Sequence, residues 1–309
     1  MNHEEKAAAP AACVLRLFGV PAERVQLAAQ ETGLAAQCRA QGAETLLALR
    51  AETPAGLAAA KRQLHAQFAA ALYGEGETTL VQAAARALEA RRRLLLVCAD
   101  ASAGALLETR LETVAAAEKV FDFGAMSYAD EKTRAKLDAK TRRVKGGAAA
   151  MALARVQAAQ RFSGAAYAAG CVERAEDTVL FLGSRKGCWV RTAANSGAPA
   201  LWLLDMTRRA ALGLPQAEGT IWQKYGCPLP PEALAVQPLT GTAVQAHPKR
   251  KKRRLRNFLL VLVLAVLAAL AAAWYFTGGD FAALPQQLPA PLQELLRADS
   301  LPRSGAKLI

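Results

Sequence analysis

Ser102 and Lys132 are of residue types that could act as a nucleophile and as its base. Ser102 follows an apolar run typical of a buried strand, and Lys132 lies in the charged stretch 130–136. A serine hydroxyl becomes a good nucleophile when a lysine of lowered pKa accepts its proton. Both residues also have structural uses, since Ser102 near Gly104 is typical of a helix N-cap and Lys132 of a solvated helix face.

Histidine and cysteine provide no further catalytic pattern. The three histidines lie in a tail, in a helix and beside a basic run, which argues against a histidine-based triad and the usual zinc sites. The six cysteines contain no Cys-x-x-Cys pair and lie mostly among apolar neighbours. We expect reduced structural thiols and no cofactor.

The pattern of apolar residues predicts the elements that must position these side chains. Residues 13–75, after a disordered tail at 1–12, alternate strands and helices and predict a small α+β domain. Residues 76–214 predict a layered α/β domain, so the fold class is α/β. Residues 215–256, rich in proline and glycine, are expected to be a linker.

Individual elements follow from the same pattern. Thr78 or Thr79 is the expected N-cap of the first helix of the larger domain, and residues 183–187 are expected to form a hairpin turn. The expected strands are 13–18, 45–51, 94–98, 120–128, 166–172, 179–183 and 188–192, and the expected helices are 22–31, 55–72, 75–88, 103–118, 148–162 and 201–212.

Residues 257–277 are expected to cross a membrane as a single helix. The run FLLVLVLAVLAALAAAWYF at 258–276 has neither charge nor proline. About 19 residues at ~1.5 Å each nearly span a hydrocarbon core of roughly 30 Å. Trp274 and Tyr275 lie at its far end, where membrane proteins place aromatic residues. A buried core helix is the alternative, but such helices rarely lack any polar position.

Positive charge is concentrated directly before this segment. The net charge is +13, and seven of the eight residues at 249–256 are basic, which leaves +6 for the rest of the chain. That remainder is too diffuse to indicate nucleic-acid binding. Basic residues beside a spanning helix stay in the cytoplasm and attract anionic lipids, so the N-terminal part is expected inside and the Pro-rich tail 278–309 outside. The basic residues are Lys249, Arg250, Lys251, Lys252, Arg253, Arg254 and Arg256.

Four segments carry a resemblance to a known family, namely VLRLFGVPAE at 14–23, ALYGEGETTL at 71–80, LLLVCADASAGALL at 94–107 and VFDFGAMSYADEKTRAKL at 120–137. Together they resemble the CinA family of competence- and damage-inducible proteins. The resemblance implies a small KH-like domain and a nicotinamide-nucleotide amidohydrolase-like domain, without the family's N-terminal molybdopterin-binding-like domain. Because residues 14–72 contain no Gly-x-x-Gly loop, no RNA binding is expected there.

Both catalytic positions that the resemblance implies carry other residues here. The family's serine nucleophile falls on Ala101, and the lysine that activates it falls on Thr133. A shift of one residue in each motif would restore a Ser102/Lys132 pair. Such a shift would also rotate a side chain by about 100° on a helix, or move it to the other face of a strand.

The substrate-binding features of the family also depart from its pattern. Its glycine-rich phosphate loop falls on 168–178, where Gly170 alone is kept and three acidic residues oppose a nucleotide phosphate. Asp100 and Tyr128 are candidates for lining a remaining pocket, although Asp100 is also typical of a helix cap and Tyr128 of strand packing. The acidic residues are Glu173, Glu176 and Asp177.

Two main hypotheses about function follow. The first is a membrane-tethered, CinA-like domain that has lost catalysis and serves as a binding, regulatory or scaffolding module at the inner membrane face. The second is a nicotinamide mononucleotide deamidase that uses Ser102 and Lys132. A third, supported by the Pro-rich tail alone, is an anchor for an outer domain. Expected partners are membrane lipid and, under the second hypothesis, a nicotinamide nucleotide. The resemblance also implies self-association.

Overall fold

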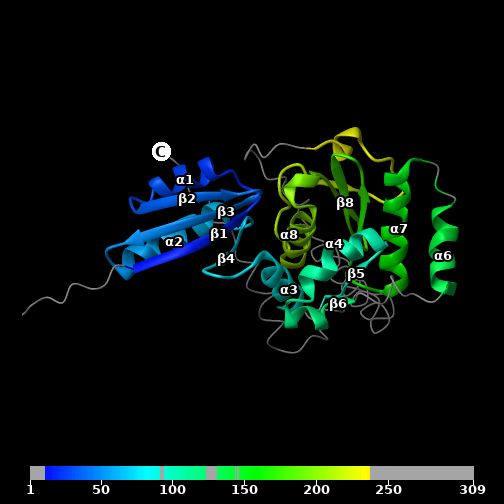
Figure 1. Ribbon diagram of the computed structural model, residues 1–309, viewed down its shortest axis with the longest axis horizontal. Coiled ribbons are helices and arrows are strands. Elements are labelled where there is room, and N and C mark those ends of the chain that lie inside the picture. Colours follow the sequence, from blue (N-terminus) through cyan, green and yellow to red (C-terminus); the bar gives the residue numbers. More distant parts are fainter. Residues whose placement is uncertain (1–10, 91–93, 123–130, 143, 145, 237–309) are drawn as a thin grey trace, which may run out of the picture. The chain divides into compact units, whose positions relative to one another are not determined.

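The computed structural model describes residues 11–90, 94–122, 131–142, 144 and 146–236, which form two β-sheets with surrounding helices (Figure 1). The smaller sheet has four strands and the larger has six. The protein therefore has a mixed α/β fold. The last strand of the smaller sheet ends at Glu75.

The smaller sheet is antiparallel, with the strand order β2-β3-β1-β4 and helices in a βαββαβ sequence. This connectivity is called ferredoxin-like. Alternate residues of β1 and β3, such as Leu15 and Leu47, are buried in a common core with Leu64 and Phe68. The elements are β1 (Ala11–Phe18), α1 (Ala22–Gln30), β2 (Ala35–Gln41), β3 (Glu44–Ala51), α2 (Pro54–Phe68) and β4 (Leu72–Glu75).

Two strands of this sheet escape sequence-based prediction. β2 contains no β-branched or aromatic residue, which are the types enriched in strands. β4 has four residues, and its first residue, Leu72, is the last residue of the helix expected at 55–72. That helix instead begins after the N-cap Thr53, whose hydroxyl accepts the Gly56 N–H, and ends at Phe68.

The larger sheet has the strand order β10-β9-β8-β7-β5-β6. β6, β5 and β7 are parallel, whereas β7 to β10 are antiparallel. Its elements are α3 (Leu80–Ala90), β5 (Leu96–Cys98), α4 (Ala101–Leu111), β6 (Phe121–Asp122), α6 (Glu131–Thr141), α7 (Ala148–Ser163), β7 (Tyr167–Glu173), β8 (Asp177–Ser184), β9 (Gly187–Ala194), α8 (Pro199–Leu212) and β10 (Ile221–Gln223), with 3-10 turns at Ala115–Lys119, Asn195–Gly197 and Pro231–Leu234.

The larger sheet separates two groups of helices, because successive residues of a strand turn to opposite faces. Leu96 and Cys98 of β5 lie in a core with α3, α4 and α8. Val97, between them, lies in a second core with α7. α6 packs against α7 and so lies outside that second layer (Figure 1).

Two glycines allow α7 to lie close to the sheet. Gly170 of β7 and Gly183 of β8 both face Val156 of α7, and a Cβ on either glycine would overlap a Val156 methyl group. Interiors are packed to nearly crystalline density, so this contact fixes the height of the helix above the sheet.

Several sequence-based boundaries can be compared directly with the structure. Thr79 is the N-cap of α3, since its hydroxyl accepts the Gln82 N–H at 3.2 Å while the Gln82 side chain accepts the Thr79 N–H at 3.1 Å. The hairpin at 183–187 is confirmed by the pairing of Ser184 with Gly187. The helix expected at 103–118 divides into α4 and a 3-10 turn.

The linker expected at 215–256 is folded over its first part. Residues 221–223 form β10, which pairs with β9, and Val236 forms a parallel bridge with Thr192. The Gln223 side-chain amide donates to three carbonyls of the following loop, at residues 224, 227 and 228. Backbone and side-chain hydrogen bonds therefore hold a segment whose proline and glycine content indicated a linker.

Other predicted features lie outside the described residues. These are residues 1–10 of the predicted tail, the basic run 249–256, the membrane span 257–277 and the tail 278–309. Residues 11 and 12, which were also expected to belong to the disordered tail 1–12, are the first two residues of β1 instead. Within the described part of the chain, no helix is both long and apolar enough to cross a bilayer. All six cysteines are described, and each is a free thiol.

Candidate functional site

Asp100 joins three elements at the carboxyl end of β5. It is the N-cap of α4, and its Oδ1 accepts the Ala103 N–H at 2.7 Å. Its Oδ2 accepts the N–H of Cys171, in β7, at 3.2 Å. Both oxygens are thus used to fasten α4 to the sheet. The structural interpretation of Asp100 as a cap is confirmed.

Ser102 is the second residue of α4 and is half-buried. The N-cap position that its sequence context suggested belongs to Asp100, because the Asp100 carboxylate reaches the first-turn N–H from one position outside the helix. Ala101, the position matched to the family nucleophile, is exposed at the first helical position.

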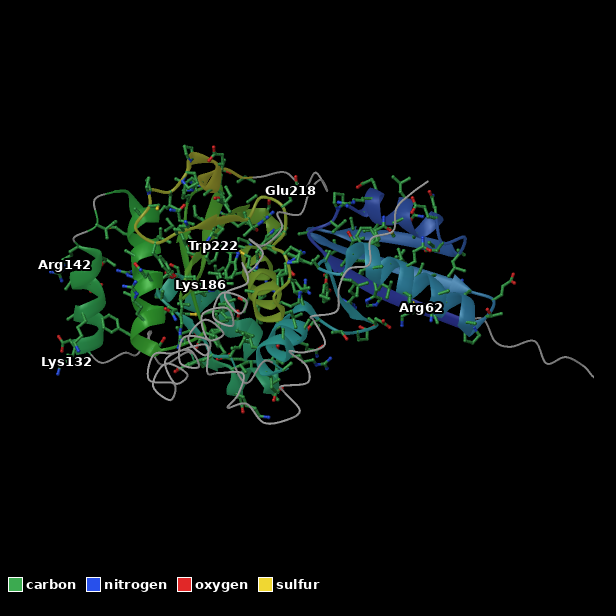
Figure 2. The ribbon with its side chains drawn as sticks, turned by 180° about the vertical axis from the view of Figure 1, so that it is seen from behind. Arg62, Lys132, Arg142, Lys186, Glu218 and Trp222 are labelled. Atoms are coloured by element: carbon green, nitrogen blue, oxygen red, sulfur yellow. The ribbon has the colours of Figure 1, made fainter. Side chains whose placement is uncertain are left out.

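Lys132 lies at the start of α6 and is exposed, as expected for a solvated helix face. The side chains of Asp138 in α6 and Arg155 in α7 pair at 3.3 Å, and a short connection joins the two helices, so they run antiparallel. The start of α6 is therefore level with the end of α7, which leads into the first residues of β7. Figure 2 marks Lys132 and Arg142 at opposite ends of α6.

The described structure does not bring Ser102 and Lys132 together. Ser102 belongs to a helix on one face of the sheet, and Lys132 to a helix beyond α7 on the other face. Ser102 also adjoins the carboxyl ends of β5 and β7, whereas Lys132 is level with the amino end of β7. The catalytic pair stays a prediction that this geometry does not favour.

The remaining candidates can be placed only in part. Tyr128 lies outside the described residues, as does the strand expected at 120–128 beyond Asp122. Thr133 lies in α6, but its side chain is not among those described. Asp100 is therefore the one predicted pocket residue whose contacts can be given.

The segment matched to a glycine-rich phosphate loop is a β-hairpin. β7 runs through Gly170 to Glu173, and β8 begins at Asp177. Arg174 donates to Asp177 at 2.5 Å, and the Asn195 amide donates to the carbonyls of the turn. Gly170 is needed for the approach of Val156, so it is an element of packing here and not part of a loop.

The titratable groups around Asp100, at the carboxyl-end edge of β5, include carboxylates and neutral thiols. Burial raises the pKa of Asp100, and the N–H groups of Ala103 and Cys171 offset part of this rise. Burial and the Asp100 charge raise the pKa of the Cys98 and Cys171 thiols, which are therefore protonated at neutral pH. Glu173 adds a second carboxylate nearby. Such an edge disfavours a phosphate.

A cluster of buried charges on α8 was not found from the sequence. Asp205, Arg208 and Arg209 are each at most 2% exposed. One carboxylate oxygen accepts from Arg208 at 2.7 Å, and the other accepts from Arg209 at 2.6 Å. Arg191 of β9 lies over the Trp202 ring at 3.5 Å, and burial lowers the pKa of its guanidinium to about 10.

The two α8 arginines connect the larger domain to the smaller one. Arg208 donates to the carbonyl of Ala70, and Arg209 to that of Phe18 at 3.1 Å. The Phe18 ring meets Trp202 edge to face, with centroids 4.7 Å apart. The spacing of an acid and two bases at i, i+3 and i+4 in an otherwise apolar helix is the signal that could have revealed this junction.

A groove of about 450 Å³ lies on the smaller domain between the start of β1 and α2. Lys61 and His65 on its rim both approach Glu75, at 2.5 and 3.5 Å. The hydrogen bond from Lys61 lowers the pKa of Glu75. The groove is lined by Ala11, Pro54, Leu57, Ala58, Lys61, Arg62 and His65, none of which is a predicted catalytic residue.

Comparison with known proteins adds no assignment. No protein-family model matches the chain, and no curated protein matches it significantly.

Proposed function

We propose that this chain is a membrane-tethered relative of the CinA family that has lost amidohydrolase activity and acts as a binding or scaffolding module at the cytoplasmic face. The amidohydrolase-like domain would hold partners near the membrane, and the segment at 257–277 would anchor it. The proposal does not require a cofactor.

The proposed loss of catalysis rests mainly on the hydrogen bonds and chain path around Asp100, at the carboxyl end of β5. An amidohydrolase acting on a nucleotide needs an activated nucleophile and a site for the phosphate. Here both Asp100 oxygens bond backbone N–H groups, and β7 continues into a hairpin where the phosphate loop would lie. The placement of the Ser102 helix on one face of the larger sheet, and of the Lys132 helix beyond α7 on the other face, also supports this part of the proposal.

Release of ammonia from nicotinamide mononucleotide tests the catalytic part of the proposal. The full chain in detergent is expected to release no more than its Ser102→Ala variant does, with circular dichroism showing that both are folded. Ser163→Ala is a matched control, because Ser163 is a second helical serine, at the far end of α7. Activity abolished by Ser102→Ala and by Lys132→Ala, and kept by Ser163→Ala, would instead establish the deamidase.

Thiol labelling in cells tests the tether and its orientation. Cys227 is exposed, and the predicted outer tail contains no cysteine. A membrane-impermeant maleimide is expected to label Ser304→Cys in intact cells and to label the native chain after lysis only. Labelling of the native chain in intact cells, or release of the chain from membranes by alkaline carbonate, would contradict the proposed topology.

A further inference from the structure

A second concentration of positive charge lies inside the folded domain. Residues 131–145 contain seven basic and two acidic residues, a net charge of +5. The juxtamembrane run at 249–256 contributes +7, so these two segments account for all but +1 of the net charge of +13. The expectation that the remaining charge of +6 is diffuse is therefore wrong. That charge belongs mainly to α6 and the residues that follow it.

The described basic side chains of this segment are exposed to solvent. Lys132, Lys136 and Arg142 are exposed, and the helix makes its main contacts with α7 (Figure 1). Figure 2 shows Lys132 and Arg142 at the two ends of the helix, at the margin of the folded unit. Leu137 is the one residue of α6 more apolar than alanine, so the helix has little apolar surface to bury.

One of the two acids of α6 is directed away from its exposed lysines. Asp138 is directed toward α7, where it pairs with Arg155 at 3.3 Å. That pair places one of the two acids of the segment on the inner side and leaves Lys132 and Lys136 outside. A helix whose exposed charges are mostly of one sign repels itself unless counter-charges lie nearby. The surface is thus complementary to a dense anionic partner.

We propose that α6 binds the anionic phospholipid surface of the membrane that anchors the chain. The inference rests on the proposed tether, which keeps the domain within reach of the lipid headgroups at a high effective concentration. Basic residues then attract the negatively charged cytoplasmic leaflet without any preformed pocket. α6 and the juxtamembrane run would act together as two contact points on one surface.

The composition of α6 favours lipid over nucleic acid. Sequence-specific recognition of nucleic acid uses arginine, asparagine or glutamine at base edges, and single strands also stack on aromatic rings. Residues 131–145 contain no aromatic residue, no asparagine and no glutamine. The four lysines of this segment carry point charges on flexible stems, which suit a fluid layer of headgroups that needs no fixed geometry.

The test measures amide hydrogen exchange of residues 131–141 in the full chain, reconstituted in nanodiscs of phosphatidylcholine with or without phosphatidylserine. Exchange is expected to be several-fold slower with phosphatidylserine, and the difference is expected to vanish at about 1 M salt, where the Debye length is about 3 Å. Lys132→Glu with Lys136→Glu should abolish it. Arg50→Glu with Arg62→Glu is the matched control, because it reverses two exposed charges in the first 75 residues. Figure 2 labels Arg62.

Each outcome decides a different claim. Equal exchange in the two lipid mixtures, or protection that survives the α6 reversals, would overturn the proposal. Protection induced by RNA in neutral discs, and absent with phosphatidylserine, would overturn it in favour of a nucleic-acid partner. If the chain does not integrate into discs, the tether fails. The same exchange experiment with added vesicles of the two compositions then decides the lipid claim separately.

Discussion

Helices α8 and α6 carry similar charged residues in opposite surroundings. In α8, Asp205 pairs with Arg208 and Arg209, and all three side chains are at most 3% exposed. In α6, Asp138 pairs with Arg155 of the next helix, and these side chains are 39% and 40% exposed. The first set is shielded from water and the second is not.

The difference teaches what decides the role of a charge in this molecule. The neighbours of Asp205 in α8 are apolar, so the helix is buried and its arginines must find acceptors inside the protein. They use the Asp205 carboxylate and the carbonyls of Phe18 and Ala70. α6 has no apolar face, so its lysines stay in water and remain available to an outside partner. Local apolar content therefore separates the buried charges of α8 from the exposed charges of α6.

The largest expected effect comes from removing the buried acid. Asp205→Asn leaves Arg208 and Arg209 without a counter-charge, and such a change costs about 3–5 kcal/mol in the free energy of unfolding. Asp138→Asn breaks a pair at the surface and should cost about 0–1 kcal/mol. Denaturant unfolding of the full chain in detergent, followed by circular dichroism, compares the two. Equal costs would show that burial does not distinguish these helices.

A smaller effect on the free energy of unfolding is expected from the close packing of α7 on the sheet. Gly170→Ala inserts a methyl group into space that Val156 occupies, and overpacking of this kind costs about 1–3 kcal/mol. Val156→Ala should relieve part of that cost in the double variant, although it leaves a cavity of its own. The denaturation midpoints of the four chains give the coupling energy. Strict additivity of the two changes would rule out the proposed contact.

Asp100 is intermediate between Asp205 and Asp138. It is largely buried, but its carboxylate accepts hydrogen bonds from neutral backbone N–H groups and not from arginines. Its pKa is raised in the folded protein, so the folded state holds the proton more tightly than the unfolded chain does. Its stabilising contribution is therefore complete below the unfolded pKa of about 3.9, and is lost as pH rises through the folded pKa.

Asp100→Asn tests this linkage. The variant loses the acceptor for the Cys171 N–H. At low pH, where the side chain at position 100 is neutral in both proteins, this loss costs about 1 kcal/mol in the free energy of unfolding. Because asparagine does not ionise, the disadvantage of the variant should shrink as the pH rises above about 4. Unfolding free energies measured from pH 3 to 7 follow this difference. A disadvantage that grows with pH would mean that the pKa is lowered instead.

The sequence predicts elements well where apolar residues follow a clear period, and poorly where tertiary contacts supply the structure. The strands around Val179 and Val190 and the helix α7 agree with their predicted ranges, because their apolar patterns are long. β2 has no residue type that marks a strand and is stabilised by pairing with β3. β10 follows a loop that Gln223 holds in place, which no local pattern reveals.

The candidate site shows the same limit. The sequence gives Asp100 a capping role that the structure confirms, because capping depends on neighbouring residues alone. Whether Ser102 and Lys132 meet depends on which face of the sheet each helix covers, and that follows from the whole topology. The charge of α6 was visible in the sequence, but its exposure needed the packing of α6 on α7.

The smallest effect on stability is expected from the α6 charge reversals. Lys132 and Lys136 are exposed, and reversing both charges should change the free energy of unfolding by no more than about 0.5 kcal/mol in detergent without anionic lipid. The reversals also lower the repulsion among the basic residues of the segment, which favours the folded state. Thermal unfolding of the variant beside the native chain measures this. A loss of several kcal/mol would show that these lysines hold α6 on the fold, as the arginines hold α8, and would remove the contrast between the two helices.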